Sequence, residues 1–453
     1  MRETFFTHDK SFYKSLFSML VIVALQNVIA YSVNMADNIM LGAYRQEALS
    51  GAAVVNQLFF IVQQTTIAIC DGLIVISAQY WGQKRTGPIR QVTGQVLRYT
   101  AAAGIVLVLA CTFFGDPILR IFTSDPVILR EAHSYLRIIK YTFFLFMITQ
   151  VLLAALRSVE TVKIAFANSC VSLILNILIN STLIYGRFGF PEMGVTGAAI
   201  GTITSRMVEL LIVLWYLLKK DGKLELFKKP GLRSITPELK EDYQKNAWPI
   251  LVGGMIWSFS IPLQTAILGH LSSDAIAANS VATTFYQYMK VIVVAMSSVS
   301  AVLMGKSIGR GDLGRVRADA RTLSVIDLLI GVLLGAVLLL TRRALLSYYA
   351  LNPTASALAD TLIVIMSFVM VGMSYQMPVS GGVLKGSGDT KFTMHMNLIS
   401  TWLIVTPLSF AAAFWWKWPI PAVVICLQSD QIFKCLPVFL RFRSYKWIHK
   451  LTR

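Results

Sequence analysis

Long apolar runs, separated by short stretches rich in charged residues, glycine or proline, make up almost the whole chain. A helix needs about 20 consecutive apolar residues to cross a bilayer, and twelve runs reach roughly that length. The expected spans are 15–38, 51–80, 93–115, 132–156, 163–186, 193–218, 246–270, 276–304, 318–340, 356–384, 392–416 and 419–440. The pattern predicts an all-α membrane protein with no separate soluble domain.

Composition supports a membrane setting. Hydrophobic residues make up 55% of the 453 residues and charged residues only 14%, whereas a soluble domain has about 25% charged residues. The net charge of +18 raises the question of a nucleic-acid partner, but such a partner needs lysine and arginine gathered on a soluble face. Here they lie between the apolar runs. We therefore expect the lipid bilayer, and no nucleic acid, as a partner.

The distribution of lysine and arginine predicts the orientation. With the N-terminus inside, the inner segments hold 29 of the 41 lysine and arginine residues. Short positively charged loops stay on the cytoplasmic side, so both termini are predicted to be cytoplasmic in a multi-pass plasma-membrane protein. The longest polar segment, 219–245, lies at mid-chain. It predicts a cytoplasmic linker between an N-terminal half, 1–218, and a C-terminal half, 246–453.

Cysteine and histidine patterns point to no metal centre or active site. The five cysteines lie in or beside apolar runs without a CxxC pair, and the five histidines are scattered. Buried thiols of this kind usually serve packing. An integral membrane enzyme would need clustered catalytic groups, so it is a distant alternative. We expect no enzyme activity, no metal and no cofactor.

The two halves repeat each other. An offset of 227 places Gly42 on Gly269 and Gly82 on Gly309, and an offset of 228 places Leu156–Arg157 on Leu384–Lys385. With six spans in each half the duplicate keeps its orientation, so the repeat is parallel, about an axis along the membrane normal. Such halves commonly enclose a central substrate site, which predicts transport by alternating access.

Five short motifs occur in order along the chain: Ala36–Gly42, Glu47–Ala52, Ala78–Gly82, Leu156–Arg157 and Lys385–Lys391. Together they resemble the multidrug and toxic compound extrusion (MATE) transporters, in particular the DinF-like branch, over nearly the whole chain. The resemblance implies two six-helix bundles in a V shape that export amphipathic, often cationic, organic compounds in exchange for H⁺ or Na⁺. We expect a monomer.

A flippase for lipid-linked precursors or polysaccharides, from the same superfamily, is the alternative function. Its cavity should be strongly basic, whereas most lysines and arginines of this chain lie in the expected cytoplasmic loops. The sequence therefore favours the drug antiporter.

Asp37 is the main candidate for ion coupling. It lies in the outer part of the first expected span, where an ionised carboxylate costs on the order of 3 kcal/mol unless it faces a cavity or a partner. By position alone it also fits a boundary residue in headgroup water. The resemblance implies that it is the coupling carboxylate of the first half.

Two amides of the fifth span accompany this candidate. Asn176 and Asn180 are four residues apart and so share one helical face. The resemblance places them beside Asp37, with Thr202 of the sixth span nearby. A purely structural role, in which the amides bond neighbouring helices, remains open.

The second half lacks matching acids. Na⁺-coupled relatives carry acids on the seventh and tenth spans, where this chain has Trp257 and Ser374, and the repeat offset places Asp37 on Gln264. Because Na⁺ prefers several oxygen ligands with charge among them, coupling is expected in the first half, with H⁺ favoured over Na⁺.

Other polar residues of the spans have less specific roles. Asp327 lies within an apolar run, and Lys290 of the eighth span fits a snorkelling side chain. Two pairs at helical spacing, Arg206–Glu209 and Asp430–Lys434, are expected to be structural ion pairs. The candidate lining of a substrate cavity consists of Asn34, Gln57, Gln63, Gln64, Asp71 and Tyr141.

Overall fold

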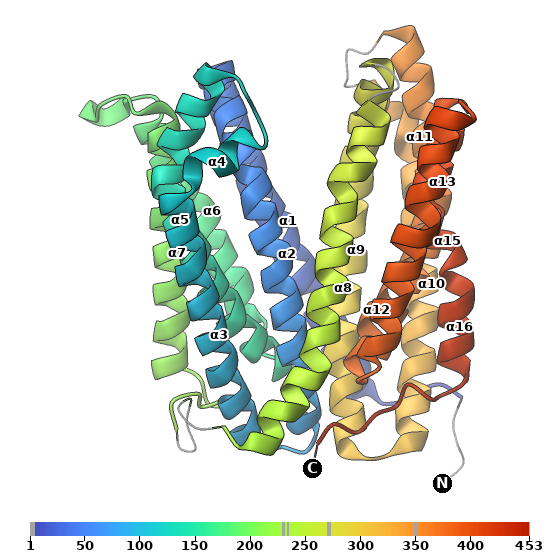
Figure 1. Ribbon diagram of the computed structural model, residues 1–453. Coiled ribbons are helices and arrows are strands. Elements are labelled where there is room, and N and C mark those ends of the chain that lie inside the picture. Colours follow the sequence, from blue (N-terminus) through green and yellow to red (C-terminus); the bar gives the residue numbers. More distant parts are fainter. Residues whose placement is uncertain (1–4, 229–231, 233–234, 270–272, 348–351, 453) are drawn as a thin grey trace. The chain divides into compact units, whose positions relative to one another are not determined.

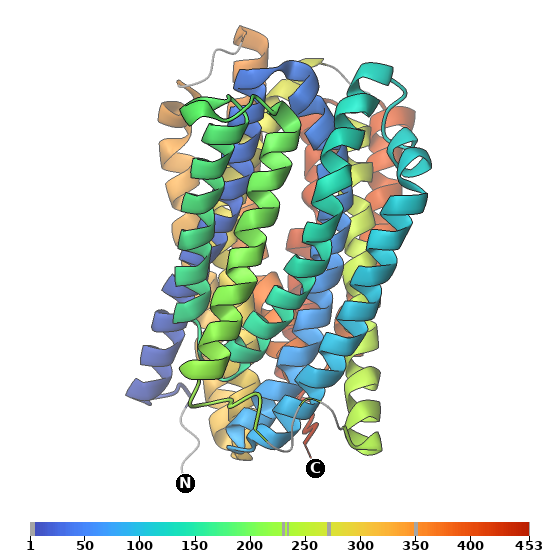
Figure 2. The same ribbon diagram turned by 90° about the vertical axis from the view of Figure 1, so that its left-hand side faces the viewer.

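The computed structural model describes residues 5–228, 232, 235–269, 273–347 and 352–452, without the side chains at 261–266, 268–269 and 273–277. The described residues are almost entirely helical, and in both side views the long helices of each part run lengthwise with their connections gathered at the ends (Figures 1 and 2). The prediction of an all-helical membrane protein is confirmed.

The first half contains α1 (Lys10–Tyr44), α2 (Gln46–Gly82), α3 (Thr86–Phe113), α4 (Gly115–Arg120), α5 (Pro126–Ser158), α6 (Lys163–Leu183), η1 (Arg187–Gly189) and α7 (Gly194–Lys219). The second half begins with α8 (Pro237–Gly269), α9 (Ser273–Arg310), α10 (Leu313–Leu346) and α11 (Pro353–Met377). It continues with η2 (Pro378–Leu384), α12 (Thr390–Leu398), η3 (Ile399–Val405), α13 (Thr406–Phe410), η4 (Ala411–Trp415), α14 (Ile420–Gln428), α15 (Asp430–Phe433) and α16 (Cys435–Arg443).

Eleven helical segments among the described residues are long and apolar enough to span a membrane. They coincide with eleven of the expected spans, and α8 is helical over the remaining one except at residue 270, which lies outside the described residues. The helices extend beyond the apolar runs: α1 covers 35 residues where 24 were expected to span. Hydropathy marks the bilayer-crossing part, whereas a helix continues until its backbone is capped or turned.

The chain forms two compact units. We call Leu25–Leu73 with Arg85–Tyr243 the N-terminal unit, and Met1–Ala24 with Ile74–Lys84 and Gln244–Arg453 the C-terminal unit. Helices α1, α2 and α8 each pass from one unit to the other. The predicted boundaries at residues 218 and 246 stay a prediction.

Equivalent turns of the two halves have the same local geometry. Lys84 ends the turn after α2 with φ of 59°, and its N–H donates to the Trp81 carbonyl at 2.9 Å. At the repeat offset, Gly311 has φ of 84°, and its N–H donates to the Ile308 carbonyl at 3.0 Å. Because each turn needs a left-handed residue at the same place, the internal repeat extends to backbone detail.

Two glycines matched by the repeat contact each other inside the C-terminal unit. A Cβ on Gly82 would lie 2.2 Å from the Lys306 carbonyl oxygen, and a Cβ on Gly309 would lie 2.0 Å from the Gln79 carbonyl oxygen. Only a residue without a side chain permits the ends of α2 and α9 to approach this closely.

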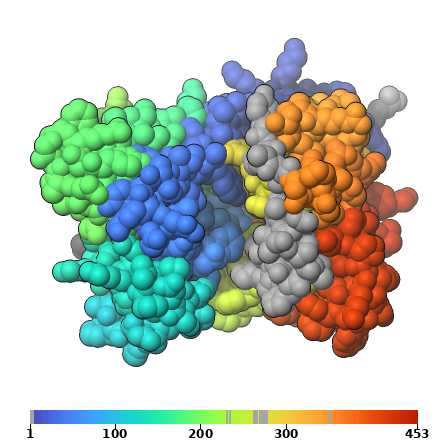
Figure 3. Space-filling model, turned by 90° about the horizontal axis from the view of Figure 1, so that it is seen from above, coloured from blue at the N-terminus to red at the C-terminus, as the bar shows by residue number. Residues whose placement is uncertain are grey.

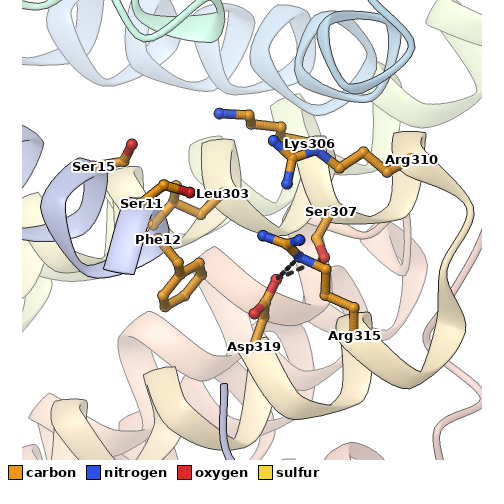
Figure 4. Close-up of a pocket in the computed structure, with 9 residues that line it drawn as sticks. All are labelled: Ser11, Phe12, Ser15, Leu303, Lys306, Ser307, Arg310, Arg315 and Asp319. Atoms are coloured by element: carbon orange, nitrogen blue, oxygen red, sulfur yellow. Dashed lines mark hydrogen bonds and ion pairs between the residues drawn. The ribbon is translucent and has the colours of Figure 1, made fainter. Parts of the chain in front are cut away.

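The start of α1 is attached to the C-terminal unit through a polar cluster. Asp9 accepts a hydrogen bond from the Ser11 N–H at 2.8 Å and forms an ion pair with Arg315 of α10. Figure 4 shows Arg315 and Ser307 pointing toward the buried Asp319, whose carboxylate accepts a hydrogen bond from the Ser307 hydroxyl at 2.8 Å. The polar side chains at this end of the bundle thus join α1, α9 and α10.

Candidate functional site

Asp37 lies on α1 inside the N-terminal unit and is only 7% exposed. The Asn180 side-chain amide of α6 donates a hydrogen bond to its carboxylate at 2.5 Å. A boundary residue surrounded by headgroup water would be exposed, so the structure favours the interpretation of Asp37 as a buried carboxylate with protein partners.

The hydrogen-bond chain continues from Asp37 to α7. The Asn180 amide also donates to the Asn176 side-chain oxygen at 3.3 Å, and the Asn176 amide donates to the Thr202 hydroxyl oxygen at 3.4 Å. Thr202 in turn donates to the Ala198 carbonyl at 3.0 Å. The structure thus brings together all four residues predicted for ion coupling, although their role in coupling stays a prediction.

Gly201 allows α7 to approach this chain. A Cβ at position 201 would lie 2.0 Å from the Asn180 side-chain oxygen, far inside van der Waals contact. That oxygen is buried and has no hydrogen-bond partner in the part of the chain that the structure describes. Because Gly201 leaves room for the amide, Asn180 can direct its donor toward Asp37.

The C-terminal end of α1 is fixed by two hydrogen bonds with the connection between α6 and α7. Tyr185 donates to the Met40 carbonyl at 2.8 Å, and Tyr44 donates to Glu192 at 2.7 Å. In Figure 3 the blue segment around the α1–α2 turn lies between the green connection of α6 to α7 and the teal segment of α4 and α5. These contacts hold α1, and with it Asp37, against α6.

Two residues of the site were not predicted. The positive charge of Arg206 acts on Asp37, and Tyr135 of α5, which is 3% exposed, also lies within range of that carboxylate. Arg206 lies four residues after Thr202, so helical spacing alone would have placed it on the same face. No sequence signal distinguishes Tyr135 from the other aromatic residues of α5.

Arg206 also forms the ion pair predicted with Glu209, at 2.8 Å. The glutamate is 6% exposed and offsets the charge of the guanidinium inside the bundle. Asp37 therefore lies near an arginine whose charge is already paired elsewhere, so its carboxylate has no dedicated counter-ion among the described residues.

Chemically, the arrangement presents one carboxylate to amide donors. The Asn180 amide points at Asp37, and the Asn176 and Thr202 side-chain oxygens already accept hydrogen bonds within the described parts of α6 and α7. Among the described residues, no group of three or more histidine, cysteine, aspartate or glutamate side chains is arranged to hold a metal ion. A proton needs a single oxygen, whereas a metal cation needs several ligands with charge among them.

The six residues predicted to line a substrate cavity take no part in these hydrogen bonds. Asn34, Gln57 and Tyr141 are exposed, and the Lys140 ammonium lies 5.2 Å from the centroid of the Tyr141 ring. Gln63, Gln64 and Asp71 are partly buried. Their cavity role stays a prediction.

Asp71 has an electrostatic partner. The carboxylate of Asp71 attracts the partly buried guanidinium of Arg157. Arg157 belongs to the Leu156–Arg157 motif at the end of α5. This attraction gives Asp71 a structural explanation beside its predicted role as a substrate contact.

Trp257 and Ser374 lie in the C-terminal unit. They are the two residues matched from the sequence to the acids of Na⁺-coupled relatives. Lys290 of α9 lies over the Trp257 ring, 5.1 Å from its centroid. The predicted Asp430–Lys434 pair is present at 2.9 Å. The side chain of Gln264, the repeat counterpart of Asp37, lies outside the described residues.

The MatE family model matches residues 23–182 and 249–411. The chain is 25% identical over 435 residues to a "Probable multidrug resistance protein NorM" of Thermotoga maritima, covering 96% of this chain and 93% of the relative. It is 23% identical to a "Probable multidrug resistance protein YoeA" of Bacillus subtilis, covering 90% and 88%.

Solved structures share the fold. One, described as the outward-facing conformation of a multidrug resistance MATE family transporter of the MOP superfamily, superposes with a TM-score of 0.86 at 16% identity over 95% of both chains. A MOP superfamily transporter from Pyrococcus furiosus gives a TM-score of 0.85 at 16% identity, again over 95% of both chains.

Proposed function

This chain belongs to the MatE family of transporters, and on that premise we propose that it is a multidrug efflux antiporter that exchanges amphipathic, often cationic, organic compounds for H⁺. The names of its relatives support the substrate class, since several are called multidrug resistance proteins. The observation that carries the proposal is the buried Asp37 carboxylate with its hydrogen bond from Asn180.

Asp37 couples the two fluxes by competition. An ionised carboxylate inside an apolar bundle is costly unless a proton or another cation compensates its charge. A proton binds when Asp37 is open to one side, and its release on the other side restores the anion. A cationic substrate and the proton therefore favour different states of the same carboxylate, which is what an exchange mechanism requires.

The bonds around Asp37 support a change of charge without rearrangement. Asn180 can donate to the carboxylate in its ionised form and to the carbonyl oxygen of the neutral acid. The Asn176 and Thr202 contacts hold Asn180 in place in both cases. Proton uptake thus alters the electrostatics of the site more than its geometry.

H⁺ is favoured over Na⁺ by the composition of the site. A single carboxylate, Asp37, stands among amide and hydroxyl groups. Na⁺ would need several oxygen ligands with negative charge among them. Alternating access of the two units, in a monomer of the plasma membrane with both termini in the cytoplasm, completes the proposal.

The test is transport by the purified protein in proteoliposomes, with pH and Na⁺ gradients imposed separately. Tetraphenylphosphonium, a lipophilic cation, serves as the probe. The proposal predicts that a pH gradient drives its uphill movement and a Na⁺ gradient at uniform pH does not. Transport driven by Na⁺ alone would replace the proton with sodium, and absence of transport under both gradients would reject the antiporter.

A further inference from the structure

Asp327 is a second buried carboxylate, in the C-terminal unit and apart from the site above. It lies on α10 and is 1% exposed. Neither of its two carboxylate oxygens has a hydrogen-bond partner among the described residues. Because native structures pair nearly all buried polar groups, a carboxylate with both oxygens unpaired needs a specific explanation.

The face of α10 that carries Asp327 packs on α11. A Cβ on Gly331, one turn after Asp327, would lie 2.6 Å from the Cβ of Ser374, and a Cβ on Gly335 would lie 2.6 Å from the Ser367 carbonyl oxygen. These glycines let the two helices approach closely. Asp327 continues the same stripe, so its side chain enters the interior of the bundle rather than the lipid.

Ser374 is unsatisfied in the same way as Asp327. Its hydroxyl oxygen is buried, and no described residue forms a hydrogen bond with it. Four residues later, Pro378 has no N–H and cannot donate to the Ser374 carbonyl, and a π-helical stretch, η2, begins there. Irregular turns of this kind are frequent at functional sites. The facing helices α10 and α11 therefore each carry a buried oxygen-bearing side chain that lacks a hydrogen-bond partner among the described residues.

Titratable groups on the packed elements do not compensate the charge of Asp327. On α11, Tyr375 is within electrostatic range of Asp327, but its hydroxyl is neutral. On α9, Lys290 lies against Trp257, whereas Lys306 and Arg310 line the separate pocket around Asp319 (Figure 4). On η2, residues 378–384 include no titratable side chain.

We propose that the buried Asp327 carboxyl is a second proton-binding site, so that the transporter carries one exchangeable proton in each unit. This inference rests on the proposed function. The step is COO⁻ plus H⁺ giving COOH: the proton comes from the solution on the side to which the bundle is open and returns to the solution on the other side.

The competing explanation is a carboxylic acid that stays neutral throughout the cycle and serves only packing. Infrared difference spectroscopy of the protein in liposomes separates the two, because a protonated carboxylic acid has a C=O stretching band that an ionised one lacks. Spectra are recorded between acidic and alkaline buffer, with and without tetraphenylphosphonium. Asp327→Asn keeps the shape of the side chain and removes the proton site.

The inference predicts two carboxylic acid bands that respond to tetraphenylphosphonium, one lost in Asp327→Asn and the other in Asp37→Asn. It also predicts that Asp327→Asn lowers the number of protons exchanged per probe molecule by about twofold, since one of two linked sites is removed. Asp360→Asn, a partly exposed carboxylate paired with Arg342 on the same bundle, is the matched control and should change neither quantity.

An unchanged spectrum and proton count in Asp327→Asn would overturn the second site while leaving the role of Asp37 intact. Loss of both bands, or of neither, in Asp37→Asn would count against the proposed function instead. If Asp327→Asn does not fold, Asp327→Glu provides the test: a shifted, still responsive band supports the second site, and an unaltered spectrum contradicts it.

Discussion

The side-chain amide of Asn180 lies 2.5 Å from the carboxylate of Asp37, although the two residues are 143 positions apart in the chain. The contact joins α6 to α1 inside one unit and gives the buried acid its nearest donor. Because Asn180 bonds Asp37 directly, we expect substitutions of Asn180 to impair transport more than substitutions of residues farther along the chain of hydrogen bonds.

Removing the Asn180 donor should impair transport more than removing Thr202. A hydrogen bond to a charged group contributes about 1.5–3 kcal/mol, so we expect Asn180→Leu to lower the pH-driven transport rate by about tenfold or more. Thr202 acts through Asn176 at 3.4 Å, so Thr202→Val should have a smaller effect. Initial rates in proteoliposomes provide the comparison, and a larger loss in Thr202→Val would contradict the order.

Gly201→Ala should disturb the site without touching any group that binds an ion. The added Cβ would lie 2.0 Å from the Asn180 side-chain oxygen and would displace the amide from Asp37. We expect a loss of pH-driven transport comparable with that of Asn180→Leu. Gly222→Ala is the matched control, since a Cβ there would meet nothing within 4 Å. Equal transport by the two alanine variants would refute the argument.

Much of the fold was predictable because the length of an apolar run is a local property. The expected spans follow from such runs, and the MATE assignment from five motifs such as Ala36–Gly42 was confirmed. The linker position and the orientation stay predictions. Helix ends were less accurate: α4 lies within a connection that showed only as a polar stretch. Local hydropathy carries no information about where a helix is capped.

The candidate site was predictable in part. Asn176 and Asn180 were recognisable by their helical spacing, and their partner Asp37 by the family resemblance. The contributions of Tyr135 and Gly201 depend on how α5 and α7 pack against α6, which only the three-dimensional structure shows. That Asp327 has no hydrogen-bond partner among the described residues is likewise a property of packing, because its sequence neighbours are ordinary apolar residues.

The close contact of Gly82 with Gly309 should govern stability. A Cβ at position 309 would lie 2.0 Å from the Gln79 carbonyl oxygen, so Gly309→Ala must separate α2 from α9. Overpacking of this kind costs about 1–3 kcal/mol, and we expect a lower melting temperature in detergent. Gly253→Ala, whose nearest neighbour would be 3.5 Å away, is the control and should melt close to the wild type.

The contact between the segment before α1 and Arg315 of α10 should weaken at acid pH. Hydrogen bonds from Ser11 lower the pKa of Asp9 from 3.8 to about 2, with the charge of Arg315 adding to the effect. Because the pKa is depressed in the folded state, the stabilisation is fully present above about pH 4 and is lost as the pH falls toward 2.

Hydrogen exchange of the segment around Asp9 and Ser11 measures this dependence. We expect exchange, corrected for its intrinsic pH dependence, to accelerate between pH 4 and pH 2 in the wild type and to be fast and nearly pH-independent over that range in Asp9→Asn. Identical profiles for the two proteins would show that the Asp9 carboxylate does not hold this segment.

The central claim is that Asp37 carries the exchanged proton, and its most direct test compares the wild type with Asp37→Asn in proteoliposomes under an imposed pH gradient. The amide preserves the size of the side chain and cannot ionise. Both proteins should insert and melt alike, and only the wild type should concentrate tetraphenylphosphonium against its gradient. Uphill, pH-driven transport by Asp37→Asn at the wild-type rate would contradict the account.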